Sequence, residues 1–152
     1  MSNARIFLQS EMTEPEAVEL PRGVACVFSA RCPGKPTCNE DAALVVSASE
    51  TASLLAVADG MGGEASGEVA SQVAAESIAV EIKALDESGA LLRTAVINGI
   101  ERANETVQQT IPGAGTTLAA VEISENAIRT YNIGDSVVLV VGGRGRIKRQ
   151  TV

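Results

Sequence analysis

Three acidic residues flank two short apolar runs, and their carboxylates are the clearest candidates for chemistry in the chain. Glu40 and Asp41 directly precede one apolar run, and Asp59 directly follows the next. Carboxylate and backbone carbonyl oxygens are the ligands that hard cations such as Mg²⁺ prefer. Gly60 comes after Asp59 and has no side chain, so its carbonyl can approach a ligand closely. This set of donors predicts a divalent metal site if the two runs come together.

The two apolar runs are predicted to pair as a β-hairpin. They cover residues 42–47 and 54–58, and the stretch 47–51 between them (SASET) is rich in turn-forming residues. A hairpin returns the outer ends of its strands to the same edge of a sheet. The three carboxylates would then repel one another, and a divalent cation relieves such repulsion.

Each motif also has a simpler interpretation. Asp-Gly, here at residues 59–60, is a common turn dipeptide, and Asp41 is a typical turn or cap residue. Taken separately, the motifs favour turns over a metal site. Their combination at the two ends of one hairpin favours the metal site.

The other elements predict an α+β fold rather than an alternating parallel α/β sheet. An apolar stripe from Val69 to Leu85 indicates one helix, and a second helix is expected from about Ser88 to the breakers Pro112 and Gly113. Before the helices, the residues 59–63 are expected to form a glycine-rich turn. Strands are predicted on both sides of the helix pair, at residues 24–30, 42–47, 54–58, 116–123, 127–133, 137–141 and 146–152.

The ends of the chain give weaker signals. Residues 1–21 are polar and acidic, and they predict a loose N-terminal arm or a first, weak strand over residues 6–8. Residues 22–152 then form the main domain. A basic cluster at 144–149 would either grip a phosphorylated partner or, as its alternating pattern favours, form the solvent face of an edge strand.

Composition excludes several classes of function. The 152 residues match one ordinary domain, their net charge is −7, and only 2% are aromatic, so a nucleic-acid partner is not expected. The apolar runs are far shorter than the ~20 residues of a transmembrane helix, and no signal peptide is seen, so we expect a cytoplasmic protein without a membrane partner. The chain has no histidine, which excludes histidine-dependent catalysis, and its three cysteines do not suggest a disulfide framework. The oligomeric state is left open.

Five short motifs follow one another along the chain: NEDA at 39–42, VADGMGG at 57–63, GEVAS at 67–71, GAGTT at 113–117 and NIGDS at 132–136. In order and spacing they resemble the motifs of the PP2C-type metal-dependent protein serine/threonine phosphatases of bacteria. The resemblance covers most of the chain from Val24 onward, and it implies an αββα sandwich of the α+β class that is incomplete at the C-terminus.

The resemblance also implies a role for each candidate residue. Asp59 would bridge two Mg²⁺ or Mn²⁺ ions, one of which Glu40 and the Gly60 carbonyl would also bind. Asp41 would orient a metal-bound water, and Asp135 would hold a third ion. Water activated by the ions would hydrolyse phosphoserine or phosphothreonine of a phosphoprotein, in the setting of cellular signalling.

Three departures from the family pattern matter. Family members usually carry an arginine before the Asn-Glu-Asp motif, but here Pro36 stands there; the adjacent Lys35 is either a phosphate-binding charge or a solvated loop lysine. Met61 and Glu64 occupy places where many members have histidine. The family's later metal-binding aspartates have no counterpart before Val152. The alternatives are therefore a truncated, inactive module that binds a metal or a partner, or a fragment that does not fold alone.

Two threonines close to the predicted site stay ambiguous. Thr116 and Thr117 would support the metal ligands as hydrogen-bonding groups, but the β-propensity of threonine explains them equally well.

Overall fold

A computed structural model describes residues 3–61, 66–85 and 91–151. The elements are, in chain order, β1 (Asn3–Leu8), β2 (Glu16–Leu20), β3 (Gly23–Val27), β4 (Asp41–Ser47), β5 (Ser53–Met61), α1 (Gly67–Lys83), α3 (Leu92–Thr110), β6 (Gly115–Thr116), β7 (Leu118–Ile123), β8 (Ile128–Ile133), β9 (Leu139–Val141), the 3₁₀ turn η1 (Gly143–Gly145) and β10 (Ile147–Gln150).

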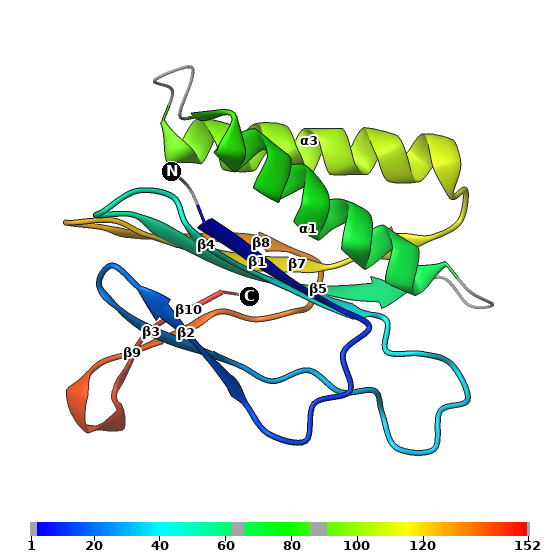
Figure 1. Ribbon diagram of the computed structural model, residues 1–152, viewed down its shortest axis with the longest axis horizontal. Helices are drawn as coiled ribbons and strands as arrows, with labels where there is room; N and C mark the ends of the chain where they lie inside the picture. Colours follow the sequence, from blue (N-terminus) through cyan, green and yellow to red (C-terminus); the bar gives the residue numbers. More distant parts are fainter. Residues whose placement is uncertain (1–2, 62–65, 86–90, 152) are drawn as a thin grey trace.

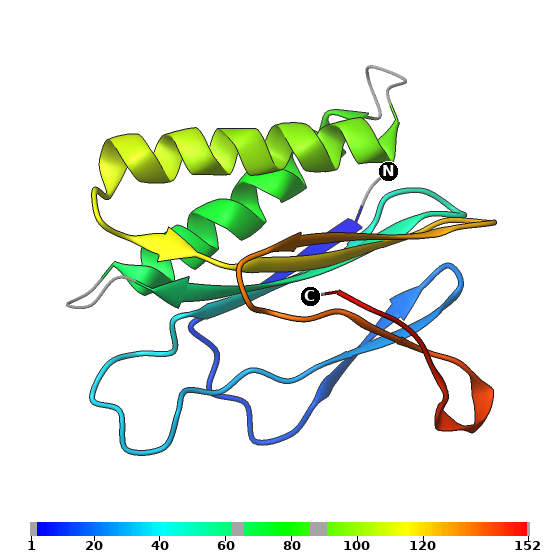
Figure 2. The same ribbon diagram turned by 180° about the vertical axis from the view of Figure 1, so that it is seen from behind.

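The fold is layered around one central sheet. Its strands follow the order β1-β4-β5-β7-β8, with β6 paired to the end of β5. Helices α1 and α3 cover one face of this sheet, and the two-stranded pairs β2–β3 and β9–β10 lie on the other (Figures 1 and 2). The pairings among the described strands are antiparallel, so the predicted α+β class is confirmed.

The predicted hairpin is confirmed. Strands β4 and β5 pair antiparallel from Asp41↔Asp59 to Ser47↔Ser53. Their turn is closed by the Ala48 N–H, which donates to the Ala52 carbonyl at 2.9 Å. Burial explains why β4 is a continuous apolar run in the sequence. Its five consecutive residues from 42 to 46 are buried because layers cover both faces of the strand.

The prediction of a glycine-rich turn at 59–63 is wrong for residues 59–61, which belong to a strand. Strand β5 continues through Asp59 and Gly60 to Met61, because β6 supplies a partner through the pairs Gly60↔Thr116 and Met61↔Gly115. The pairing joins residues more than 50 positions apart, so the local Asp-Gly signal did not reveal it. Gly62, Gly63 and Glu64 lie outside the described residues, as does the predicted helix cap Ser88.

The first 21 residues, predicted as an arm or a weak strand, contain two strands. β1 pairs with β4 over six residues and so belongs to the central sheet, while β2 pairs with β3 in the second layer. Strand β2 escaped prediction because Pro15 and Pro21 bracket its five residues, and proline usually marks a turn or an edge.

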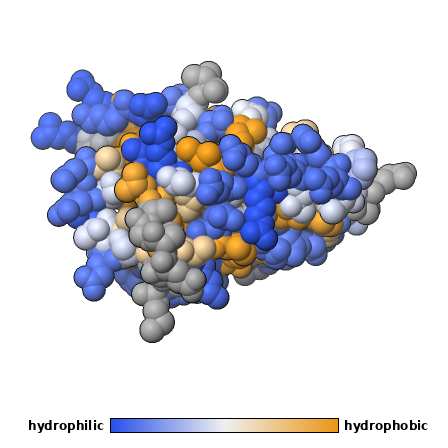
Figure 3. Space-filling view, turned by 90° about the horizontal axis from the view of Figure 1, so that it is seen from above, coloured by the Kyte–Doolittle hydropathy of each residue, from blue (hydrophilic) through white to orange (hydrophobic). Residues whose placement is uncertain are grey.

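Two cores hold the layers together. The larger core lies between the helices and the central sheet, and its fully buried members include Leu44, Leu54, Ile78 and Val96. The helices cross closely at Gly99, where a Cβ atom would lie 2.6 Å from the Cα of Ile78. Seen from the helix side, the surface is mostly hydrophilic with small apolar patches (Figure 3).

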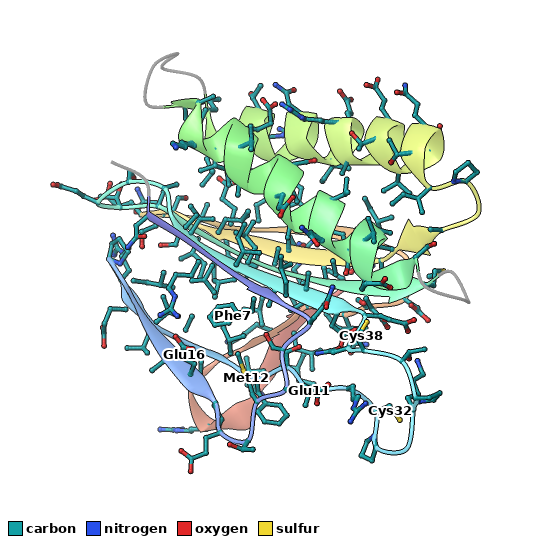
Figure 4. All side chains as sticks on the ribbon, turned by 45° about the vertical axis from the view of Figure 1, so that its right-hand side comes forward. Phe7, Glu11, Met12, Glu16, Cys32 and Cys38 are labelled. Atoms are coloured by element: carbon teal, nitrogen blue, oxygen red, sulfur yellow. The ribbon has the colours of Figure 1, made fainter. Side chains whose placement is uncertain are left out.

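The smaller core lies between the central sheet and β2–β3. It comprises Phe7, Ala25, Val27, Ala43 and Val45. Phe7 and Met12 point into the space between these layers (Figure 4).

The remaining boundaries shift by a few residues. The strand expected at 116–123 is divided at Thr117 into β6 and β7, and the last two predicted strands shorten to β9 and β10. All four residues of β10 are exposed, which agrees with the edge-strand interpretation of the basic cluster. Within the described ranges, no helix is long and apolar enough to cross a lipid bilayer.

Candidate active site

The outer end of the β4–β5 hairpin gathers four of the predicted site residues. Asp41 and Asp59 are direct partners across the two strands. One residue farther along, the Gly60 N–H donates to the Glu40 carbonyl at 3.2 Å. The backbone itself therefore places Glu40, Asp41, Asp59 and Gly60 at neighbouring positions.

Burial and charge act together on the two aspartates. Asp41 is half-buried while Asp59 is exposed. Burial and the adjacent Asp59 carboxylate raise the pKa of Asp41 above its usual value. The negative charges of the two aspartates lie at the same end of the hairpin, so a cation bound there would be stabilised.

Lys35 supplies a cation at this position in the structure. Its Nζ donates to Glu40 Oε2 at 3.2 Å, and the Glu40 side chain is 17% exposed. The hydrogen bond to Glu40 and its negative charge raise the pKa of Lys35. The Glu40 carboxylate is thus turned toward Lys35, and among the residues that the structure describes no three acidic or cysteine side chains converge as a set that could hold a metal ion.

A pocket of about 210 Å³ opens beside these groups. The loop before β4 forms its outer wall, and Figure 4 shows Cys38 beside the strand ends and Cys32 farther out along this loop. The residues that line the pocket are Arg31, Cys32, Lys35, Cys38, Asn39, Glu40, Asp41 and Asp59. The pocket therefore combines two basic side chains with three carboxylates.

Asn39 fixes the entry of the chain into β4. Its side chain is 2% exposed, and its Nδ2 donates to the Ser10 carbonyl and to Ser29 Oγ, both at 2.8 Å. Its Oδ1 accepts from the Asp41 N–H at 3.1 Å. In the sequence, Asn39 stands out only as part of the NEDA motif. Asparagine side chains often accept a hydrogen bond from the backbone N–H two residues later in a turn, and this tendency is the signal that would have revealed the role of Asn39.

Thr116 and Thr117 hold the backbone of Asp59. The Thr117 N–H donates to the Asp59 carbonyl at 2.9 Å, and the Asp59 N–H donates to Thr117 Oγ1 at 3.1 Å. The Thr116 hydroxyl lies 3.1 Å from the Asp59 carbonyl oxygen and 3.0 Å from the Thr117 carbonyl oxygen. Thr117 Oγ1 also lies 2.5 Å from Ser136 Oγ. The supporting interpretation of these threonines therefore agrees with their contacts.

Asp135 is exposed, and among the described residues it does not join two other acidic side chains in a group that could hold a metal ion. Its role as a metal ligand stays a prediction. Its neighbour Ser136 contacts Thr117 and lines a second cavity that Asp41 and Asp59 border. This cavity measures about 500 Å³ and separates the central sheet from residues 26–29 and 136–139.

The chain matches one known family of proteins over most of its length. The sequence model of the family described as protein phosphatase 2C matches residues 31–151, a span that contains all the predicted site residues. The chain belongs to the protein phosphatase 2C family. Its predicted membership is thereby confirmed.

Individual protein phosphatase 2C relatives match parts of their length. The serine/threonine protein phosphatase PstP of Mycobacterium tuberculosis, from strains CDC 1551/Oshkosh and H37Rv, is 37% identical over 91 residues, which cover 56% of this chain and 17% of PstP. The chain thus spans less than a fifth of this relative.

Solved protein phosphatase 2C structures share the fold. The catalytic domain of PstP in complex with two manganese ions superimposes with a TM-score of 0.57 at 25% identity, covering 97% of this chain and 54% of that one. A bacterial serine phosphatase bearing an R161A mutation gives a TM-score of 0.63 at 27% identity, covering 80% and 57%. The chain spans about half the length of these solved relatives.

Proposed function

We propose that this protein phosphatase 2C chain is a metal-dependent protein serine/threonine phosphatase, acting on phosphoserine and phosphothreonine of phosphoproteins in the cytoplasm. The observation that carries the proposal is the pairing of Asp41 with Asp59, one residue from the hydrogen bond between Gly60 and Glu40. This pairing supports the proposal because it brings the backbone of these four residues to the same edge of the sheet. Their carboxylate and carbonyl oxygens are donors that suit Mg²⁺ or Mn²⁺.

The donor set fits a hard divalent cation. The candidate ligands for the first two ions are the carboxylates of Glu40 and Asp59 and the carbonyl of Gly60, with Asp41 beside them. Gly60 leaves no room for a side chain, since a Cβ atom there would lie 2.0 Å from the Gly67 carbonyl oxygen. Burial and the Asp59 carboxylate raise the pKa of Asp41, and a cation would balance the negative charge of the two aspartates.

Each residue has its own part in the proposed reaction. A divalent ion held here would supply an acidified water and would neutralise charge on the phosphate. The part of Asp41 would be to orient the attacking water. Lys35 lies in the same pocket, and its ammonium, once released from Glu40, offers a positive charge to the substrate phosphate. Asp135 is the proposed ligand of a third ion.

A catalytically inactive module that binds a metal or a partner is the second candidate. One observation favours it: the carboxylates that the structure describes do not converge as a set of three. Such a module would bind Mn²⁺ and gain thermal stability without turnover.

The two candidates are separated by one assay. We expect the wild-type chain to hydrolyse a phosphothreonine peptide in the presence of Mn²⁺, chelator to stop the reaction, and Asp59→Asn to abolish it. Glu125→Gln, in an exposed turn, is the matched control and should retain full activity. Mn²⁺-induced stabilisation without turnover supports the inactive module, and turnover that is insensitive to chelator contradicts both candidates.

A further inference from the structure

The first turn of α1 rests directly on the site. A Cβ atom at Gly67 would lie 2.9 Å from both the carbonyl carbon and the carbonyl oxygen of Gly60. A Cβ atom at Gly60 would in turn lie 2.0 Å from the Gly67 oxygen and 2.7 Å from the Glu40 oxygen. Real Cβ atoms do not approach backbone this closely, so two glycines are needed where the helix crosses the end of β5.

Ser71 connects this turn to Glu40. Its side chain is 0% exposed, and its Oγ lies 2.6 Å from the Glu40 carbonyl oxygen and 3.1 Å from the Glu68 carbonyl oxygen. A hydroxyl has one proton to donate, and the shorter distance assigns that proton to Glu40. The Glu40 carbonyl therefore accepts from Ser71 of the helix and from the Gly60 N–H of β5.

This bond is unlike the usual bond of a helical serine. Serine inside a helix commonly bonds the carbonyl three or four residues earlier in the same helix. Ser71 instead reaches a residue 31 positions away, on the loop that carries a proposed metal ligand. Ser77 is also buried on α1, and it provides an internal comparison.

We infer that Ser71 is a positioning residue for the metal site. Its hydroxyl fixes the Glu40 peptide against Gly60 and α1, and this sets the spacing between the Glu40 and Gly60 donors. The inference rests on the proposed function, because it takes these two residues as metal ligands. Loss of the hydroxyl leaves the Glu40 carbonyl with one donor fewer and lets the Glu40 loop move relative to β5.

Mn²⁺ titration of the metal-free chain tests the role without depending on catalysis. Ser71→Ala is compared with wild type and with Ser77→Ala by isothermal titration calorimetry, at a temperature where circular dichroism shows all three to be folded. We expect Ser71→Ala to lose about ten- to a hundred-fold in Mn²⁺ affinity, the usual loss for a group that supports a metal ligand. Ser77→Ala should stay within about twofold of wild type, because only its packing changes.

The possible outcomes are distinct. Equal Mn²⁺ affinity of Ser71→Ala and wild type overturns the inference alone, as does an equal loss in Ser77→Ala. A wild-type chain that binds no Mn²⁺ overturns the proposed function and the inference together. Should Ser71→Ala not fold, Ser71→Cys keeps the buried volume with a weaker donor, and a Mn²⁺ affinity equal to wild type in that variant overturns the inference.

Discussion

Asp41 and Asp59 face each other across β4 and β5 as direct register partners. Two carboxylates opposite each other in an antiparallel pair repel, and such a pair is normally destabilising. The strands nevertheless remain paired at this point because Thr116 and Thr117 bond the Asp59 backbone and Asn39 bonds the Asp41 amide. The scaffold thus holds together two charges that a divalent cation would balance.

Asp41→Asn should make the metal-free chain more stable. Removing one of two opposed like charges is expected to raise the free energy of unfolding by up to about 1 kcal/mol. Thermal melts in the presence of chelator measure this gain, and the same melts with Mn²⁺ should show a smaller metal-induced shift than wild type. A lower melting temperature of the variant in chelator would contradict the proposed repulsion.

Lys35→Met should strengthen Mn²⁺ binding at low ionic strength by a few-fold. The Lys35 ammonium bonds Glu40 and so competes with a metal ion for that carboxylate. Calorimetric titration measures the affinity, and added salt should reduce the difference because the pair is exposed to solvent. Lys148→Met, an exposed lysine on β10, is the control and should have no such effect. Weaker Mn²⁺ binding by Lys35→Met would show that Lys35 assists the ion.

Tyr131 should titrate with a pKa of about 12. Burial and the hydrogen bond to Glu122 Oε2, at 2.6 Å, both favour the neutral phenol. The chain has one tyrosine and no tryptophan, so absorbance at 295 nm reports this side chain alone. The folded protein should ionise near pH 12 and the denatured protein near pH 10.

This difference in the pKa of Tyr131 between the folded and the unfolded chain makes the stability of the fold depend on pH. Between pH 10 and 12 the unfolded chain releases the Tyr131 proton and the folded chain keeps it, so the free energy of unfolding should fall as the pH rises through this window. Tyr131→Phe should flatten that fall. A folded-state midpoint at pH 10 would contradict the burial and the hydrogen bond described for Tyr131.

Gly60→Ala should destabilise the fold by about 3 kcal/mol, because its Cβ atom would collide with the Gly67 and Glu40 backbone. Gly143→Ala is the matched control: no atom lies within 4 Å of its added Cβ, so only a small change is expected. Urea denaturation measures both. A Gly60→Ala variant as stable as Gly143→Ala would show that α1 does not pack on β5 as described.

Local patterns were sufficient to predict the β4–β5 hairpin and the meeting of its acidic ends. The apolar runs and the turn between them are contiguous in sequence, and hairpin geometry alone brings Asp41 to Asp59. The helix stripes were equally local. The order of the motifs was sufficient for the family, which the match over residues 31–151 confirms.

Contacts between segments that are distant in the sequence could not be predicted from such local patterns. The bond from Ser71 to Glu40 and the continuation of β5 beside β6 depend on how α1 and β6 pack, which no local spacing encodes. The bond between Lys35 and Glu40 depends on the path of an irregular loop.

The proposed phosphatase function depends above all on one ion held between Glu40, Asp59 and Gly60. The most direct measurement is an anomalous difference map from crystals of the chain soaked in Mn²⁺. We expect a peak within bonding distance of a Glu40 carboxylate oxygen, an Asp59 carboxylate oxygen and the Gly60 carbonyl oxygen. A saturated crystal with no peak there, or with its peak bound by other residues, would contradict it.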